Sequence, residues 1–495
     1  MNTPLPINTN PSLKRNYLFN VSLTISNIVF PIITFSYVAR VFGPEILGKI
    51  NSIASLAAFF SLIASFGLSI YGTSAIAKER DDQSSLNNLF SEFVSITFLS
   101  SIVSTVFYLS LFLFLPKVKN NVGLFLIYGS NVLFTFMSID WLYQGFERYQ
   151  YITIRNIISK IAFLGSIVLI IRSKGDFLLF GGIVFLSFFI PNLHGLYRAR
   201  AVVNFHPDFL AFRKHARVLL TTSSSLITVS IYAVLDNAIL GFLAGDVYVG
   251  YYSTAMKITR IITAVSTSIA TVLLPRLSYY IENNRIDEFN ALAKKSLHFI
   301  YLIGLPSFFG VIILAPEIID CLAGKQFGQA VSALRIAAMI IPVVGLTNLI
   351  GLQVLIPLGK LKEQFFATLT AAIASIGLYF VLIPLYKHNG AALATAIAEG
   401  IVLVVQLAYV RRGLLAFRLL DRVFAKYACM SLVMAAALLG ALHFVTLKPL
   451  FQLIAGISIG AGIYFFGLVL MKDALVVEVT DMISRVFGRV KSNAD

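Results

Sequence analysis

The sequence predicts an all-α polytopic membrane protein with about 14 transmembrane helices. Of its 495 residues, 58% are hydrophobic and only 13% are charged, whereas about 25% are charged in a typical soluble domain. The apolar residues form long continuous stretches without alternation, which excludes a transmembrane β-barrel. Lipid cannot satisfy backbone polar groups, so these stretches are predicted to cross the bilayer as a helical bundle.

Each stretch is long enough to cross a hydrocarbon core of about 30 Å, which takes roughly 20 residues. The polar segment Met1–Asn16 and the long apolar run after it do not resemble a cleavable signal peptide. The predicted crossings are 17–38, 48–72, 89–115, 122–143, 154–171, 177–197, 217–243, 248–274, 293–315, 329–356, 364–385, 390–410, 423–445 and 450–471.

Lysine and arginine residues are distributed unevenly between the loops that join these crossings. About 26 fall in one set of alternate loops and about 9 in the other. Positive charge accumulates in cytoplasmic loops, so the basic set, which includes both termini, is predicted to be cytoplasmic. The net charge of +16 is thereby explained by membrane topology and does not indicate nucleic-acid binding.

A short repeat relates the two halves of the chain. Gly43–Ser52, between the first two crossings, matches 245–254, between the seventh and eighth, in glycine spacing and in its final polar pair. Six crossings separate the two segments, so the halves are predicted to be parallel repeats, with a shared cavity at the interface between them. Small residues of the second crossing, from Ser52 to Ser61, indicate a close contact between helices.

The repeat divides the chain into two pseudo-symmetric lobes followed by two further crossings. A helix at 473–490 would place its apolar residues on one face, as in a helix lying on the inner membrane surface. The predicted segments are a cytoplasmic tail at 1–16, an N-lobe at 17–197, a cytoplasmic linker at 198–216, a C-lobe at 217–410, two crossings within 411–471 and a cytoplasmic amphipathic tail at 472–495.

A few ionisable residues remain within the crossings once the loop charges are assigned. Asp236, Lys257, Arg260 and Glu399 are the clearest. Inserting a charged side chain at mid-bilayer costs at least about 2.5–3.5 kcal/mol, so such residues usually face a cavity or a partner. Lys160 is a further candidate, but its side chain could instead extend to the inner surface.

Asp236 and Lys257 lie at similar predicted depth on sequential antiparallel helices, which makes an ion pair between them plausible, whether structural or functional. Lys257 and Arg260 are three residues apart and share one helical face. One carboxylate cannot neutralise both cations, so we expect the pair to attract an anionic ligand such as a phosphate. Glu399 and Asp236 are candidates for charge pairing or for binding a coupling ion.

The segment between the fourth and fifth crossings, from Asp140 to Asn156, is rich in aromatic and charged residues. It is predicted to be a turn on the inner face, where aromatic and basic residues anchor helix ends. Asp140 could pair there with Arg148 or with Arg155. The residues that stand out in this segment are Trp141, Gln144, Gly145, Glu147, Arg148, Arg155 and Asn156.

This segment closely resembles one found in Wzx-type O-antigen and polysaccharide flippases. These belong to the polysaccharide transport family of the multidrug and oligosaccharidyl-lipid (MOP) exporter superfamily, which also contains the MATE transporters. The similarity extends over the whole chain, in the 14-crossing layout and in three further segments: Phe42–Gly48, Leu274–Ser278 and Asn389–Ala392.

The resemblance implies a carrier that moves an undecaprenyl-diphosphate-linked oligosaccharide to the periplasmic leaflet of the bacterial inner membrane. It implies alternating access between two lobes, a cationic cavity and coupling to an ion gradient of H⁺ or Na⁺. Arg260, Lys257 and Lys160 would then meet the diphosphate, while Asp236, Glu399 and Asp140 would serve ion coupling or charge pairing. A polysaccharide polymerase and chain-length proteins are the partners it suggests.

Three other functions are weighed against this one. A lipid II-type flippase has a similar anionic cargo. A MATE-type cation antiporter would need buried acids in excess of buried bases, which Lys257 and Arg260 oppose. A membrane-embedded glycosyltransferase or polymerase would need a site-bearing loop or domain, and the predicted loops are short. The six histidines and two cysteines have no ligand spacing, so neither a metal nor a cofactor is predicted.

Overall fold

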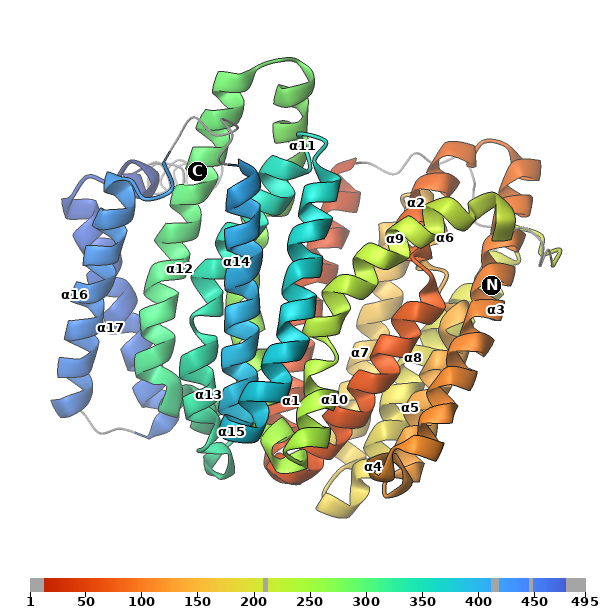
Figure 1. Ribbon diagram of the computed structural model, residues 1–495, viewed down its shortest axis with the longest axis horizontal. Helices are drawn as coiled ribbons and strands as arrows, with labels where there is room; N and C mark the ends of the chain where they lie inside the picture. Colours follow the sequence, from red (N-terminus) through yellow and green to blue (C-terminus); the bar gives the residue numbers. More distant parts are fainter. Residues whose placement is uncertain (1–12, 208–211, 411–417, 445–447, 478–495) are drawn as a thin grey trace, which may run out of the picture. The chain divides into compact units, whose positions relative to one another are not determined.

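The computed structural model describes residues 13–207, 212–410, 418–444 and 448–477, and these residues are almost entirely helical (Figure 1). The predicted tail from 478 onwards and residues 1–12 lie outside the described residues. The helices are α1 (Leu13–Ser65), α2 (Leu68–Glu79), α3 (Gln83–Phe114), α4 (Pro116–Lys119), α5 (Val122–Leu133), α6 (Asp140–Gly145), α7 (Tyr149–Ile170), α8 (Phe177–Ala199), α9 (Phe212–Ala233), α10 (Asp236–Leu243), α11 (Asp246–Glu282), α12 (Ile286–Leu322), α13 (Ala330–Ala337), α14 (Ile340–Asn348), α15 (Leu361–Val410), α16 (Arg422–Phe444) and α17 (Pro449–Leu470).

Ten helices in the described part of the chain are long and apolar enough to cross a membrane, or eleven if a bent pair counts as one. Two helices, α1 with 53 residues and α15 with 50, each contain two predicted crossings. A straight helix of 50 residues would be about 75 Å long, more than twice the hydrocarbon thickness. Each has a kink, at Gly43 with φ 72° and at Lys387 with φ 52°. This multi-pass bundle is consistent with the predicted fourteen crossings.

The fourth, seventh and tenth crossings are interrupted. The fourth comprises α5, a 3₁₀ turn at Phe134–Met137 and α6. The seventh is broken between α9 and α10, and Asp236 lies in the first turn of α10. The tenth continues from α14 into a π-helix at Leu349–Leu355. Interruptions at corresponding places in two repeats, as in the fourth and tenth crossings here, often mark binding sites in transporters.

The chain divides into two compact units. The first contains residues up to Ser253 together with Tyr379–His388, and the second contains Thr254–Leu378 and the chain from Asn389. The lobe boundaries predicted at 17–197 and 217–410 remain a prediction.

The core of the first unit lies where α2, α3 and α6 meet. Trp141 is 4% exposed and packs edge-on against Phe93, with ring centroids 5.5 Å apart. Leu68, Ile76 and Phe90 belong to the same cluster. The core of the second unit joins α12 to α16 and α17 through buried side chains such as Tyr301, Tyr427 and Tyr464.

The two glycine segments of the predicted repeat pack against each other within the first unit. A Cβ added to Gly48 would lie 1.8 Å from the Asp246 carbonyl oxygen, and one added to Gly250 would lie 2.0 Å from the Pro44 carbonyl oxygen. Gly48 matches Gly250 in the repeat, and Pro44 matches Asp246. The contact is therefore reciprocal, as expected of repeats related by a two-fold axis.

Candidate functional site

The segment from Asp140 to Asn156 joins four helices of the first unit. A Cβ on Gly145 would lie 2.6 Å from the Ile76 side chain, so α6 and α2 approach closely because this residue is glycine. Gln144 accepts a hydrogen bond from Thr73 on α2 over 3.1 Å. Tyr143 donates one to the Gly195 carbonyl on α8 over 2.6 Å. The unusual composition of the segment is thus explained by what its side chains contact.

The charged residues of this segment form two ion pairs of different kinds. The Arg155 Nη2 atom lies 2.5 Å from Asp140 Oδ1, and the Arg155 side chain is only 6% exposed. Of the two partners predicted for Asp140, it is Arg155 that binds. Glu147 pairs with Arg80 on α2 over 3.2 Å, with both side chains well exposed.

The remaining residues of this segment are close by. Asn156 accepts a hydrogen bond from Arg155 over 3.3 Å. Arg148 precedes α7, and its backbone N–H donates to the Tyr143 carbonyl over 2.8 Å. These contacts place α7 relative to the end of α6.

Lys160 on α7 binds side chains of α1. Its Nζ donates to Ser26 Oγ over 3.1 Å and also to Asn27 Oδ1. Lys160 is therefore held within the first unit, and it does not line the cavity described next. Its predicted extension to the inner membrane surface stays a prediction.

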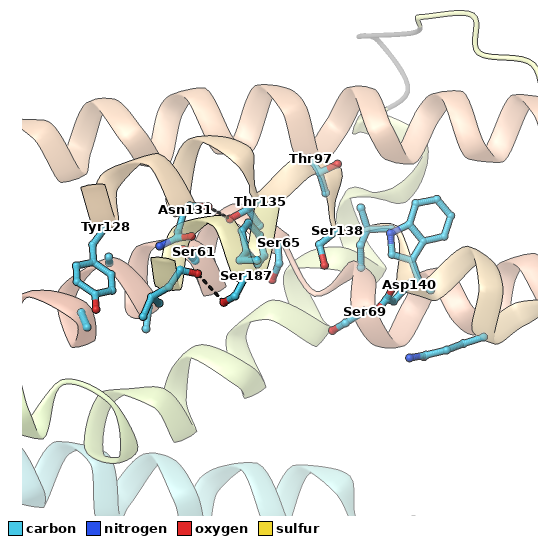
Figure 2. A pocket seen from close by; sticks show the side chains of 18 residues that line it. Ser61, Ser65, Ser69, Thr97, Tyr128, Asn131, Thr135, Ser138, Asp140 and Ser187 are labelled. Atoms are coloured by element: carbon cyan, nitrogen blue, oxygen red, sulfur yellow. Dashed lines mark hydrogen bonds between the residues drawn. The ribbon is translucent and has the colours of Figure 1, made fainter. Parts of the chain in front are cut away.

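A cavity of about 490 Å³ lies beside Asp140, the partner of Arg155, and Figure 2 shows the side chains that line it, Asp140 among them. It follows the interrupted fourth crossing, from Tyr128 and Asn131 through Ser138 to Gln144. Of 18 lining residues, 11 carry a hydroxyl, amide or carboxylate side chain. Asp140 is the one charged residue among them.

This cavity could not be predicted from the sequence, because its wall on α1 consists of small residues that are also typical of close helix packing. Ala54, Ala57, Ala58 and Ser61 line the cavity, where their small side chains leave space open. The same stretch of α1 also packs closely against α3, since the Ser104 hydroxyl donates to the Phe60 carbonyl over 2.7 Å. Ser61 and Ser65 are four residues apart on α1, which places both hydroxyls on one helical face, and Ser69 follows on α2.

Another polar cluster that the sequence did not indicate connects α3 to α9. Glu92 is 8% exposed and His215 3% exposed. The His215 Nε2 lies 2.8 Å from Glu92, and its Nδ1 lies 2.9 Å from the Tyr71 hydroxyl. Lys214 donates to the same carboxylate over 3.0 Å. The cluster fixes the start of α9 against α2 and α3.

The second unit holds Lys257 and Arg260 on α11 and Glu399 on α15. Arg260 lies close enough to both Lys257 and Glu399 for their charges to interact. The sequence placed Lys257 and Arg260 on one helical face, and the fold of the second unit brings Glu399 near Arg260. A cationic pair with one carboxylate beside it can attract an anion.

Asp236, in the first unit, is fully buried. It accepts a hydrogen bond from the Tyr252 hydroxyl over 2.8 Å and another from Asn237 Nδ2 over 2.9 Å. Its predicted pairing with Lys257 stays a prediction. Within the described residues, no group of three or more His, Cys, Asp or Glu side chains could hold a metal ion.

Comparison with known proteins identifies similar sequences and folds. Residues 13–281 match the family model "Polysaccharide biosynthesis protein", and residues 222–383 match the model "MatE". The "Putative O-antigen transporter" of Escherichia coli (strain K12) is 25% identical over 82% of this chain and 99% of its own length. The "Probable low-salt glycan biosynthesis flippase Agl15" of Haloferax volcanii is 27% identical over 62% of this chain and 65% of its own length.

Solved structures share the fold. The lipid II flippase MurJ in an inward closed conformation has a TM-score of 0.77 at 18% identity and covers 93% of this chain and 100% of its own. An inward-facing multidrug-resistance MATE family transporter of the MOP superfamily has a TM-score of 0.63 at 15% identity, over 80% of this chain and 97% of its own.

Proposed function

Because this chain belongs to the polysaccharide biosynthesis protein family, we propose that it is a Wzx-type flippase of the MOP superfamily that translocates a lipid-linked oligosaccharide. The cargo would be an undecaprenyl-diphosphate-linked repeat unit of O-antigen, capsule or another surface polysaccharide. It would move from the cytoplasmic to the periplasmic leaflet of the bacterial inner membrane, with both termini of the protein in the cytoplasm.

The observation that carries this proposal is the grouping of Lys257 and Arg260 beside Glu399 in the second unit. A diphosphate must carry negative charge into a region of low dielectric, where electrostatic attraction is much stronger than in water. Arg260 can bind phosphate oxygens through two parallel hydrogen bonds, and Lys257 adds a point charge next to it.

Transport would proceed by alternating access and would be coupled to an ion gradient. Glu399 is close to Arg260, so a change in its protonation would alter the charge seen by the diphosphate. Asp236 sits at a break in the seventh crossing, where interrupted helices often bind coupling ions. Loading either carboxylate with H⁺ or Na⁺ would bias the equilibrium between inward-open and outward-open states. A polysaccharide polymerase and chain-length proteins would receive the product.

Two other transport functions remain as alternatives. A lipid II-type flippase would carry the same diphosphate with a different sugar, and the fold shared with MurJ permits it. A MATE-type antiporter of organic cations is less well supported, because Arg260 and Lys257 would repel its cargo. A membrane-embedded glycosyltransferase or polymerase is disfavoured because the relatives are transporters and flippases. We propose that the protein catalyses no chemical step.

Complementation of a flippase-null strain tests the proposal. Arg260→Ala and Lys257→Ala should each reduce surface glycan at least tenfold at matched protein levels, and Arg260→Lys should restore part of it. Arg285→Ala serves as the control, since it removes an exposed arginine paired only locally with Glu288 over 2.5 Å. Failure of the wild type to restore glycan would contradict the function. Full activity of Arg260→Ala and Lys257→Ala would contradict the role of the cationic pair.

A further inference from the structure

We propose that the cavity in the first unit is a binding subsite for the sugar part of the cargo. This inference rests on the proposed function, since it assigns a second place on the same carrier to the same lipid-linked oligosaccharide. The neutral saccharide would be bound there by hydroxyl and amide groups, which differ in charge from the cationic pair proposed for the phosphates.

The charge of the cavity selects the chemical class of its ligand. No lysine or arginine is among the residues that line it, so a phosphate would find no counter-charge there. Its one carboxylate, Asp140, is already paired with Arg155 over 2.5 Å, so an organic cation would have to displace an existing partner. A neutral ligand with many hydroxyl groups fits this lining best.

Several polar atoms of the lining have no partner among the described residues. Asn131 Oδ1 is buried and accepts no hydrogen bond. The side-chain hydroxyls of Ser61, Ser69 and Ser138 make no hydrogen bond with another described residue, although all three face the cavity. Folding normally pairs a buried group such as the Asn131 oxygen, because leaving it unpaired costs about 1–3 kcal/mol. Ser69 and Ser138 are exposed, so their hydroxyls are open to a ligand. Hydroxyl groups of a saccharide could both donate to and accept from these atoms.

The backbone around the cavity also differs from an ordinary crossing. The wall between Asn131 and Asp140 is the interruption of the fourth crossing, where a 3₁₀ turn at Phe134–Met137 separates α5 from α6. The tenth crossing, its counterpart in the second half, contains the π-helix at Leu349–Leu355. Helices interrupted at corresponding places in two repeats are typical of transporter binding sites.

The size of the cavity is also suitable. Its volume of about 490 Å³ lies within the range of roughly 300–1,000 Å³ found for small-molecule sites. The alanines of α1, among them Ala58, provide this space, since larger side chains there would fill it. Substitution at Ala58 can therefore remove the volume without removing a hydrogen-bonding group.

The test measures binding of two lipids to purified protein in nanodiscs. One is undecaprenyl diphosphate without sugar, and the other is the undecaprenyl-diphosphate-linked oligosaccharide extracted from the native host. Asn131→Ala and Ala58→Leu should each weaken binding of the sugar-bearing lipid about tenfold and leave binding of the sugar-free lipid unchanged. Arg260→Ala should weaken binding of both lipids.

Two substitutions serve as matched controls: one changes a residue next to the cavity, and the other changes a residue outside it. Ser130→Ala changes the residue next to Asn131. The Ser130 hydroxyl donates to the Leu126 carbonyl over 3.1 Å. Ala162→Leu adds the same bulk as Ala58→Leu at an exposed position of α7. Thermal unfolding of every variant verifies that it is folded. Ser61→Ala, which removes one hydroxyl and adds no bulk, provides a third cavity variant should one of the others unfold.

The outcomes separate the two proposals. If the wild type binds both lipids and the cavity variants bind the sugar-bearing lipid as the wild type does, the sugar subsite is wrong and the flippase function stands. The same conclusion follows if the cavity variants weaken binding of both lipids equally. If the wild type binds neither lipid, the proposed function fails, and the sugar subsite fails with it.

Discussion

Asn51 donates a hydrogen bond from its Nδ2 to Ser253 Oγ over 2.8 Å, across 202 residues of chain. The two residues occupy the same position in the two copies of the glycine segment. When equivalent residues of two copies bind each other, their contact lies on the axis that relates the copies. The reciprocal contacts of Gly48 and Gly250 surround the Asn51–Ser253 contact. The repeat recognised in the sequence is thus also a point of contact in the structure.

Gly48→Ala should destabilise the protein. The added Cβ would meet the backbone of Asp246 at 1.8 Å, and backbone cannot move aside as a flexible side chain can. We expect a loss of about 1–3 kcal/mol, the usual cost of overpacking, seen as a lower midpoint of thermal unfolding in detergent. Gly165→Ala is the control, because nothing lies within 4 Å of its Cβ position. Equal midpoints for the two variants would show that the segments separate without cost.

Lys117 on α4 connects both copies of the repeat. Its Nζ forms an ion pair with Asp246 and donates to the Gly241 carbonyl over 2.7 Å and to Ser52 over 3.3 Å. A double-mutant cycle of Lys117→Met and Asp246→Asn should give a coupling free energy of about 0.5–3 kcal/mol, because the two side chains touch and are largely buried. Strict additivity of the two effects on thermal unfolding would contradict a direct interaction.

Asp140→Asn should cost far more stability than Glu147→Gln, although both break an ion pair of the same segment. Asp140→Asn leaves the buried Arg155 without its carboxylate, which costs about 3–5 kcal/mol. Glu147→Gln breaks an exposed pair with Arg80, worth about 0–1 kcal/mol. Unfolding midpoints of the two variants, measured side by side, decide the matter, and a smaller loss for Asp140→Asn would refute the prediction.

Asp473 should stabilise the protein in a way that depends on pH. Burial raises its pKa, but hydrogen bonds from Lys426, the Val476 N–H and Tyr427 outweigh burial, so the pKa lies below its ordinary value. A carboxyl with a lowered folded-state pKa stabilises the fold above its unfolded pKa of about 3.9, and this contribution is lost as the pH falls through the folded pKa.

Asp473→Asn should therefore lower the unfolding midpoint clearly at pH 7 and by much less near pH 3. Glu288→Gln provides the control, since that carboxylate is exposed and forms its salt bridge locally with Arg285. A penalty for Asp473→Asn that is equally large at both pH values would mean that its charge is not what stabilises the fold.

The crossings could be predicted because hydropathy and helix length follow directly from the chemistry of the bilayer. The interruptions in them could not. Nothing in the segment Phe134–Met137 distinguishes a 3₁₀ turn from α-helix, since the choice depends on what packs beside it. Loops between separate helices were expected near Gly43 and Lys387. In the structure, α-helix extends to each of these residues from both sides, so only a kink separates the two crossings.

The site residues show the same division. Lys257, Arg260 and Glu399 could each be singled out as candidates, because charge within an apolar helix is rare enough to stand out. That Glu399 lies near Arg260 could not be predicted, since the two residues are far apart in the chain. The cavity could not, since serine and alanine every three or four residues suit a tight helix contact as well as an open wall. The partners of Lys160 could not be predicted either, since Ser26 on α1 is 134 residues away in the chain.

Sequence alone determined that this is a polytopic membrane protein with two related halves, because burial in lipid permits few solutions and repeats persist in residue spacing. It also determined that cations exceed acids on the eighth crossing. Only the tertiary structure decided which acid pairs with which base, where small residues enclose space, and that the two glycine segments contact each other. Those outcomes depend on distances between residues far apart in the chain, which hydropathy and periodicity do not contain.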